Sequence, residues 1–229
     1  MLKTFSVLLC SLALVLAACG DDDDEQPATK TTTSAPAAEE QEAGCKDVDQ
    51  PPPRDGGAHE KPQKALDSGK TYEVVLSTSC GAFTIRLDQK SAPKAAASFA
   101  ALARSGFFDD TIFHRIVPGF VIQGGDPTAS GTGGPGYSTT DRVPANAAYG
   151  PGVVAMAKAG NEPAGTAGSQ FFVVTGADAG LTPDYAVLGK VTKGMDVVQA
   201  IGELGDPASG GAGTPLESVV IEGTRVRER

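Results

Sequence analysis

One stretch of the sequence, residues 113–126, holds the side chains best suited to recognising a peptide. It reads FHRIVPGFVIQGGD, and two strands meeting at Pro118-Gly119 would put Arg115 and Gln123 on a face that also carries large apolar groups. A fixed guanidinium donor, a flat phenyl wall and an amide suit the binding of a peptide. A surface arginine beside core phenylalanines would give the same pattern, so this stretch alone leaves both interpretations open.

Motifs for other kinds of chemistry fail on spacing or context. Residues 131–136 match G-x-G-x-x-G, but residues 137–140 after them do not open a helix, as a dinucleotide site requires. His59-Glu60 begins like a zinc-protease motif, yet position 63 is Gln. The chain has two histidines and no G-x-S-x-G sequence, which argues against a His-rich metal site and a serine-hydrolase elbow. We therefore expect no metal and no cofactor.

Short strands are the elements that must position the peptide-binding stretch. Strand-like alternation or short apolar runs occupy residues 72–76, 82–87, 111–117, 119–123, 152–157, 170–175, 186–191 and 216–226. A helix is expected over 93–104, with Pro93 at its start and Gly106 after its end, and a second over 195–201. Mostly antiparallel strands, two helices and many glycines favour a closed barrel or a sandwich, and the helices could plug the ends of a barrel.

Length and charge place the chain among ordinary globular proteins. Its 229 residues suffice for one substantial domain with attachments, and 40% of them are hydrophobic. The formal net charge is −9, and the Lys and Arg residues show no clustering. A nucleic-acid-binding surface is therefore not expected. We expect a monomer with no nucleic-acid partner.

The first 18 residues are typical of an export signal. Lys3 supplies a positive charge, and residues 7–18 form an apolar run too short for a comfortable membrane span of roughly 20 residues. The sequence LAAC that ends at Cys19 resembles the lipobox of bacterial lipoproteins, in which the cysteine becomes the lipidated first residue. A plain secretory signal with an incidental Cys19 is the alternative. The resemblance implies an extracytoplasmic protein that is lipid-anchored to the bacterial cell membrane.

Residues 19–66 show no hydrophobic periodicity and are expected to form a flexible tether. An acidic run occupies residues 21–24, Thr, Ala and Glu residues follow, and residues 51–53 are three consecutive prolines. Such a segment cannot bury enough apolar surface to offset the entropy lost on ordering. The tether would hold a globular domain, residues 67–229, clear of a membrane surface.

Two cysteines remain once Cys10 leaves with the signal and Cys19 carries the lipid. An exported compartment permits disulfides. We therefore expect Cys45 and Cys80 to be bonded, which would fix the end of the tether to the first hairpin. Two free thiols are the alternative interpretation.

Three further motifs follow the first stretch in order along the chain: GTGG at 131–134, MAKAG at 156–160 and GSQFF at 168–172. Together with residues 113–126 they resemble the sequence signature of the cyclophilin family of peptidyl-prolyl cis-trans isomerases. The similarity extends from about residue 71 to residue 226, which is essentially the whole globular part. It implies a closed eight-stranded antiparallel β-barrel capped by two α-helices.

The resemblance also implies roles for residues of this chain. Arg115 matches the catalytic arginine, and the positions that match the pocket for the proline ring are Phe120, Met156, Phe172 and Leu181. By the same resemblance, the side chains of Gln123 and Gln170 are expected to contact the substrate, and the backbone of Ala157 and Lys158 is expected to hydrogen-bond to it. Gly133 and Gly134 match the loop that forms the floor beside the pocket for the residue preceding proline. Lys158 stands where many relatives have Asn, and Tyr185, also a substrate-binding position, stands where many have His.

These roles predict an isomerase that accelerates rotation of X-Pro bonds in unfolded or partly folded exported proteins. Midway through rotation the proline nitrogen becomes pyramidal and its lone pair becomes usable, and a donor such as Arg115 would stabilise that twisted state over the planar ones. Two alternatives remain open: a non-catalytic module that holds proline-containing segments as a chaperone, and a purely structural surface lipoprotein.

Overall fold

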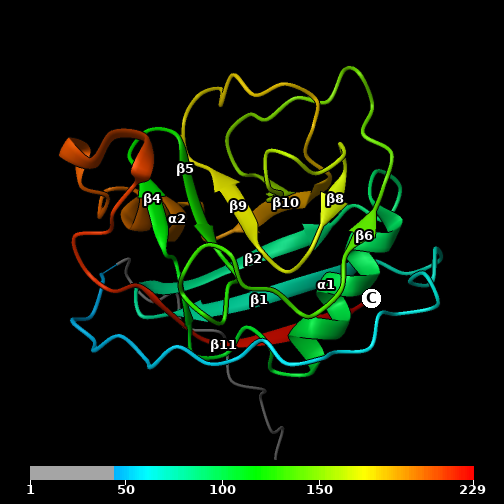
Figure 1. Cartoon of the computed structure of the whole chain (residues 1–229), viewed down its shortest axis with the longest axis horizontal. Coiled ribbons are helices and arrows are strands. Elements are labelled where there is room, and N and C mark those ends of the chain that lie inside the picture. Colours follow the sequence, from blue (N-terminus) through cyan, green and yellow to red (C-terminus); the bar gives the residue numbers. More distant parts are fainter. Residues whose placement is uncertain (1–43) are drawn as a thin grey trace, which may run out of the picture. The chain divides into compact units, whose positions relative to one another are not determined.

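The computed structural model describes residues 44–229, which fold around a strongly curled antiparallel sheet (Figure 1). Its strands are β1 (Tyr72–Thr78), β2 (Gly81–Leu87), β3 (Thr111–Ile112), β4 (Arg115–Val117), β5 (Val121–Gly124), β7 (Val153–Met156), β9 (Phe171–Val174), β10 (Val187–Lys193) and β11 (Val220–Glu228). Two short strands, β6 (Thr139–Thr140) and β8 (Thr166–Ala167), pair separately. The helices are α1 (Pro93–Arg104), α2 (Met195–Gly202) and the 3₁₀ helix η1 (Pro207–Ala212). Within residues 44–229, no helix is long and apolar enough to cross a membrane.

The sheet closes because one segment pairs with both of its ends. The strand order is β3-β11-β1-β2-β10-β7-β9-β5-β4. β3 pairs with β11, while β4, which begins three residues after β3 ends, pairs with β5. These two pieces together are the strand predicted over 111–117, and counting them as one gives the eight-stranded barrel that the family resemblance implies. A bridge between Ile112 and Asp126 links the two edges.

Alternating side chains fill the barrel with an apolar core. Inward-facing residues of the strands pack with the buried face of α1. Phe99 of α1 lies against Phe108 and Phe171, with ring centroids 4.7 and 5.3 Å apart. In Figure 1, α1 and α2 lie at opposite ends of the sheet, where each covers apolar residues that would otherwise meet water.

A second, smaller apolar cluster lies on the outer face of β5, β7 and β9. Its buried members are Val121, Tyr149, Ala155, Phe172 and Val174. The strand residues among them alternate with neighbours that face the barrel core, such as Ile122 and Val173. Because side-chain direction along a strand has a period of two, these three strands present two apolar faces, and the outer one is where a site can form.

Residues 44–66 lie against the barrel, so the expected flexible tether is wrong for this part of the chain. Residues 1–43, which include the predicted export signal, Cys19 and the rest of the tether, lie outside the described residues. We call residues 44–66 the strap. Its Arg54 donates hydrogen bonds to the carbonyl oxygens of Phe107 and Asp109. Polar contacts of this kind hold the strap although its sequence has no apolar periodicity.

The strap begins at a disulfide between Cys45 and Cys80, as the sequence predicts. Cys80 lies in the turn between β1 and β2. Beside the disulfide, the amide of Lys46 donates to the carbonyl oxygen of Ser79 at 2.9 Å. The start of the strap is therefore fixed to the first hairpin.

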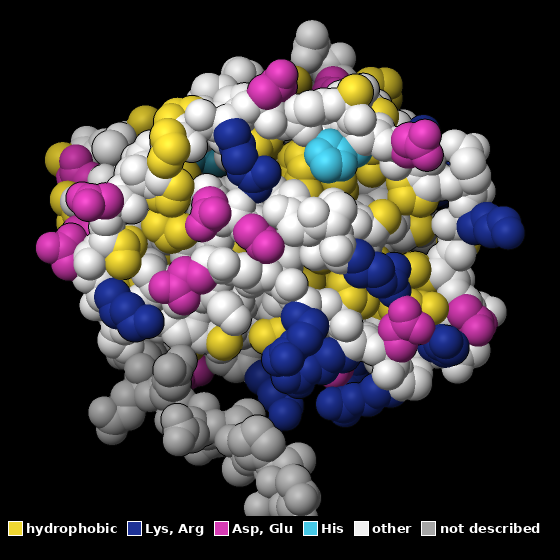
Figure 2. Space-filling view, turned by 90° about the horizontal axis from the view of Figure 1, so that it is seen from below, with side chains coloured by type: hydrophobic (Ala, Val, Ile, Leu, Met, Phe, Trp, Pro, Cys, Tyr) yellow, Lys and Arg dark blue, Asp and Glu magenta, His cyan; other side chains and the backbone are white. Residues whose placement is uncertain are grey.

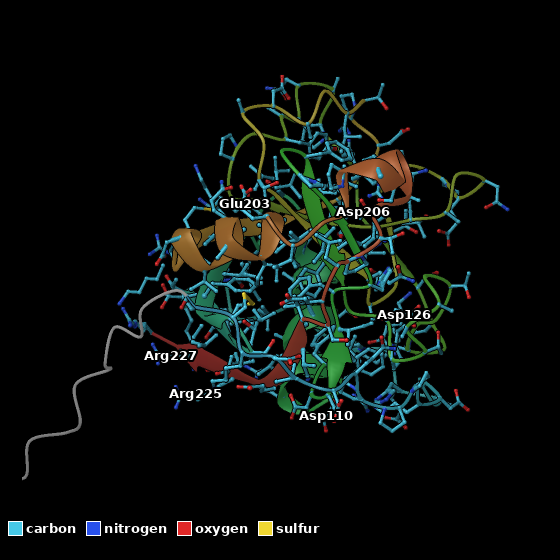
Figure 3. All side chains as sticks on the ribbon, turned by 90° about the vertical axis from the view of Figure 1, so that its left-hand side faces the viewer. Asp110, Asp126, Glu203, Asp206, Arg225 and Arg227 are labelled. Atoms are coloured by element: carbon cyan, nitrogen blue, oxygen red, sulfur yellow. A yellow bond between two sulfur atoms is a disulfide. The ribbon has the colours of Figure 1, made fainter. Side chains whose placement is uncertain are left out.

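Folding gathers positive charges that the sequence leaves dispersed. On the outer face of β11, β1, β2 and β10, one row of aligned residues consists of Arg227, Glu73, Arg86 and Lys190. Lys and Arg side chains gather in the lower part of Figure 2, and Figure 3 shows Arg225 and Arg227 together on β11. Lys and Arg residues that do not cluster along the sequence therefore do gather on this face, where Glu73 pairs with Arg86 at 3.5 Å. The expected lack of a nucleic-acid partner stays a prediction.

Loss of the bond between Cys45 and Cys80 should lower the free energy of unfolding by about 2–4 kcal/mol, because it releases a constraint on the unfolded chain. The bond spans a sequence separation of 35 residues. Urea unfolding with and without reductant measures the change. The double variant Cys45→Ser/Cys80→Ser should match the reduced protein and should not respond to reductant. Equal stability of the oxidised protein and the double variant would contradict a stabilising role.

Candidate active site

The outer face of β5 and β9 opens beside β4 into a hollow of about 190 Å³. The strand register assembles it, because Arg115 of β4 lies opposite Gln123 of β5, which in turn lies opposite Phe172 of β9. The lining residues are Arg115, Phe120, Val121, Gln123, Ala157, Lys158, Phe172, Leu181 and Tyr185. All but Val121 were predicted site residues, so the structure brings most of the predicted set together.

Two acceptors hold the Arg115 guanidinium at this hollow. Its Nε and Nη2 both donate to the carbonyl oxygen of Gly211, at 3.1 and 2.9 Å, and its Nη1 donates to Oε1 of Gln123 at 3.4 Å. The guanidinium carbon lies 5.7 Å from the centroid of the Phe120 ring. Burial lowers the pKa of Arg115 from its ordinary value, but a guanidinium stays protonated in proteins. The site therefore offers a fixed and partly desolvated cation.

The chain after η1 is shaped to fit around Arg115. Gly213 has a φ of +67°, and a Cβ built on it would lie 2.6 Å from Cγ2 of Val117 and 2.8 Å from Cγ of Arg115. Its carbonyl oxygen accepts the amide of Ile116 at 2.7 Å. A larger residue would strain the backbone and displace the arginine. Sequence reasoning missed this segment, for which a glycine-rich run was the available signal.

Aromatic side chains form another wall of the hollow. Tyr185 packs edge-on against Phe172, with ring centroids 5.4 Å apart, and the Lys158 ammonium lies 5.7 Å from the Tyr185 ring. The hydroxyl of Tyr149 donates to the Tyr185 carbonyl oxygen at 2.8 Å and accepts the Tyr185 amide at 3.0 Å. Burial, partly opposed by these hydrogen bonds, raises the pKa of Tyr149, so the hydroxyl stays protonated. Tyr149, which sequence reasoning missed, thus positions Tyr185.

A chain of amide side chains joins the hollow to a second cavity of about 550 Å³. Gln123 donates from Nε2 to Oε1 of Gln170 at 3.1 Å, and Gln170 donates from Nε2 to the carbonyl oxygen of Gly133 at 3.0 Å. Gly133 and Gly134 lie in the loop that lines this second cavity. The predicted site residues therefore fall into two adjoining hollows, with Gln123 lining both.

Asp126 shapes the loop that follows β5. This loop, not Asp126 itself, lines the larger cavity. The residue is fully buried, and its carboxylate accepts the amides of Thr128, Gly131 and Gly133 at 2.8, 2.6 and 3.1 Å. It also accepts the Thr128 hydroxyl at 2.7 Å. Burial alone would raise the pKa of Asp126, but the hydrogen bonds outweigh it and hold the pKa below its ordinary value. Sequence reasoning assigned this carboxylate no role.

One predicted contact is wrong. Met156 is buried in the barrel core and lines neither hollow, because it shares the inward face of β7 with Val154. Val121 occupies the hollow instead. It lies two residues before Gln123 on the same strand, so strand alternation was the signal that could have identified it. Within residues 44–229, no group of three or more His, Cys, Asp or Glu side chains could hold a metal ion.

Comparison with known proteins decides the family. The family model described as cyclophilin type peptidyl-prolyl cis-trans isomerase/CLD matches residues 73–226. The chain belongs to the cyclophilin family. The peptidyl-prolyl cis-trans isomerase CYP18-2 of Arabidopsis thaliana is 35% identical over 166 residues, which cover 71% of this chain and 98% of the relative. The peptidyl-prolyl cis-trans isomerase-like 1 of Aspergillus oryzae is 38% identical over 160 residues, covering 68% and 96%.

Solved cyclophilin structures share this fold. The cyclophilin type peptidyl-prolyl cis-trans isomerase of Cryptosporidium parvum matches with a TM-score of 0.62 at 30% identity, covering 69% of this chain and 98% of that one. A structure of the same protein in the presence of the dipeptide Ala-Pro gives a TM-score of 0.61 at 31% identity, covering 68% and 98%. The chain is thus a cyclophilin-type peptidyl-prolyl cis-trans isomerase. Its strap precedes the matched cyclophilin domain, which begins at residue 73.

Replacing Asp126 by Asn should lower the free energy of unfolding of the cyclophilin domain by about 1–3 kcal/mol at neutral pH, because the backbone amides of the loop lose a buried charged acceptor. The pKa of Asp126 is lower in the folded than in the unfolded state, so its contribution is present at neutral pH and is lost as the pH falls below about 5. Urea unfolding across this pH range measures both effects. Plotted against pH, the free energies of unfolding of the wild type and the variant should converge at low pH. A difference that stays constant with pH would contradict the lowered pKa of Asp126. Asp49→Asn, at an exposed strap residue, is the control.

Proposed function

We propose that this cyclophilin turns X-Pro bonds by holding the proline ring in the smaller hollow and directing the Arg115 guanidinium at the proline nitrogen. The position of Arg115 carries the proposal, because a fixed cation lies beside the apolar surfaces of Phe120 and Phe172. Gly211 and Gln123 orient its donors. The amide side chains between the two hollows offer polar contacts to the rest of the peptide.

The electrostatics of the hollow favour the twisted peptide bond over the planar one. Rotation about the X-Pro bond must break amide resonance, and this gives the rotation a barrier of about 18–20 kcal/mol. In the twisted state the proline nitrogen becomes pyramidal, and its lone pair, no longer delocalised, can accept a hydrogen bond from a guanidinium N–H. That lone pair is engaged in resonance in both planar isomers, so the hydrogen bond stabilises the transition state selectively.

The required stabilisation is within the range of such a contact. Shortening an exchange time of ~10 s to ~1 ms takes about 5.5 kcal/mol off the barrier. A charge-assisted hydrogen bond in a partly desolvated hollow, together with orientation of the peptide, supplies energies of this order. Arg115 suits the role because its planar donors stay charged.

Replacing Arg115 by Ala should reduce kcat/KM for an Ala-Pro peptide by about 10²–10³-fold, the usual cost of removing one transition-state donor. A proline-isomerisation assay on the full chain measures the loss. The matched control is Arg225→Ala, which removes an exposed arginine of β11 outside both hollows and should keep wild-type activity. Equal activity of wild type and Arg115→Ala would favour the second candidate, a non-catalytic module that binds proline-containing segments as a chaperone.

We further propose that the enzyme acts as a monomer on exported proteins outside the cytoplasmic membrane of a bacterium, held there by lipid on Cys19. The apolar run before Cys19 and the LAAC sequence support this location. The disulfide between Cys45 and Cys80 also supports it, because such bonds persist mainly in oxidising, exported compartments. Exported chains arrive unfolded, and rotation of their X-Pro bonds needs no ATP.

Lipidation at Cys19 is tested by expressing the chain in bacteria. The wild-type protein should fractionate with membranes, and mass spectrometry should find lipid on its N-terminal peptide. Cys19→Ser should lose the lipid and leave the membrane fraction, since one anchor is removed. Cys45→Ser, a cysteine of the strap, is the control and should keep the lipid. An exported wild-type chain without lipid on Cys19 would support the plain secretory signal instead.

A further inference from the structure

The strap reaches the rim of the larger cavity. The amides of Arg54 and His59 donate to carbonyl oxygens in the loop 127–135, at 2.9 and 3.0 Å. Between these two hydrogen bonds, Asp55 lines the cavity. The family match begins at residue 73. A segment outside the cyclophilin domain therefore supplies part of the cavity wall.

Glycines make this docking close. Gly56 is buried, and a Cβ built on it would lie 2.0 Å from the carbonyl oxygen of Gly134. Across the same contact, a Cβ on Gly136, whose φ is +83°, would lie 3.0 Å from the carbonyl oxygen of Gly57. The two backbones touch where side chains would separate them. The strap is therefore a fixed wall of the cavity, and its docking sets the position of Asp55.

Three charged side chains line the larger cavity: Asp55 from the strap, and Lys158 and Glu162 from the loop after β7. The Lys158 ammonium donates to the carbonyl oxygens of Ala159 and Glu162 at 3.3 and 3.1 Å, and the Glu162 carboxylate accepts the Ala159 amide at 2.6 Å. Within residues 44–229, Asp55 accepts one hydrogen bond, from the Gly57 amide at 3.1 Å, and it forms no ion pair. Asp55 can therefore meet a cation from outside the chain.

We propose that Asp55 selects a Lys or Arg side chain among the substrate residues that precede proline. The proposal rests on the proposed function of the smaller hollow, which would hold the proline ring. Gln123, Ala157 and Lys158 line both hollows, so a peptide bound in one continues into the other. A carboxylate at an exposed rim attracts a cation only modestly, which affects the choice of substrate more than the rotation itself.

Peptides that differ by one charge test this selection on the full chain. Each contains a single X-Pro bond, with Lys, norleucine or Glu at one of the two positions before proline. Norleucine resembles the apolar stem of Lys without its charge. For the wild-type chain at low salt, kcat/KM should be about three-fold higher for Lys than for norleucine, and lowest for Glu. The preference should shrink in about 0.5 M salt, because exposed charges are screened.

Two Asp→Asn substitutions in the strap distinguish the effect of the Asp55 charge from an effect on the structure of the strap. Asp55→Asn removes the charge but keeps an oxygen for the Gly57 amide, so the strap should stay docked. It should lower kcat/KM for the Lys peptide to the value for the norleucine peptide. Asp49→Asn removes the same charge at an exposed strap residue that lines neither hollow, and it should keep the wild-type ratio.

A third variant tests whether the docked position of the strap is needed for Asp55 to act on the substrate. Gly56→Val should displace the strap from Gly134 and remove the Lys preference although Asp55 is still present. Urea unfolding checks that the cyclophilin domain of each variant is folded. Retention of the full preference by Asp55→Asn, or no preference in the wild type, would overturn the proposal.

Absence of isomerase activity can be distinguished from absence of selection by Asp55. In that case the chain would leave the exchange rate of every peptide unchanged, whatever its charge. Calorimetric affinities of the same peptides would then measure the selection alone. An affinity ratio of about three between Lys and norleucine that disappears in Asp55→Asn would support the role of Asp55 in binding, and equal affinities would overturn it.

Discussion

Closure of the barrel by residues 111–117 is the constraint on which the site depends. This segment pairs with β11 at one end and with β5 at the other, so it cannot shift without opening the sheet. A slip of β4 by one residue would turn Arg115 towards the core and Ile116 away from it. Because Arg115 lies opposite Gln123, the same pairing starts the chain of amides that reaches Gly133. One strand pairing therefore serves both the fold and the placement of the guanidinium.

The two faces of β5, β7 and β9 differ in what they contact: the inward face packs into the barrel core, and the outward face borders the smaller hollow. Their inward residues fill the core, where each fully buried large apolar side chain contributes about 1.5–3 kcal/mol. On their outward side, Gln123 of β5 accepts a hydrogen bond from Arg115 of β4, a cation that burial disfavours, as its lowered pKa reflects. The carbonyl oxygen of Gly211 offsets part of that cost by accepting two of its donors. The guanidinium is therefore held in surroundings where water screens its charge less than in bulk solvent.

Sequence patterns predicted the elements better than the contacts between them. Alternation located the eight barrel strands, and ordered motifs located Arg115, because both signals depend on local spacing. Met156 was misplaced because a motif match ignores which face of a strand a residue occupies. The disulfide at the start of the strap was predicted, but the docking of the rest was missed because it depends on hydrogen bonds and close glycine contacts, neither of which gives apolar periodicity. Arg86 of β2 and Arg227 of β11 come to flank Glu73 only when β11, from the end of the chain, pairs with β1.

The rate of isomerisation on the enzyme, compared with the affinity for the same peptide, tests most directly whether the guanidinium acts on the transition state. Exchange NMR at saturating Ala-Pro peptide and a binding titration give both quantities for the wild type and for Arg115→Lys. Lys keeps a positive charge but lacks the planar donors that Gly211 orients. We expect the affinity to change by less than about three-fold and the on-enzyme rate to fall by at least about ten-fold. An unchanged rate, or equal falls in rate and affinity, would contradict selective stabilisation of the twisted bond by Arg115.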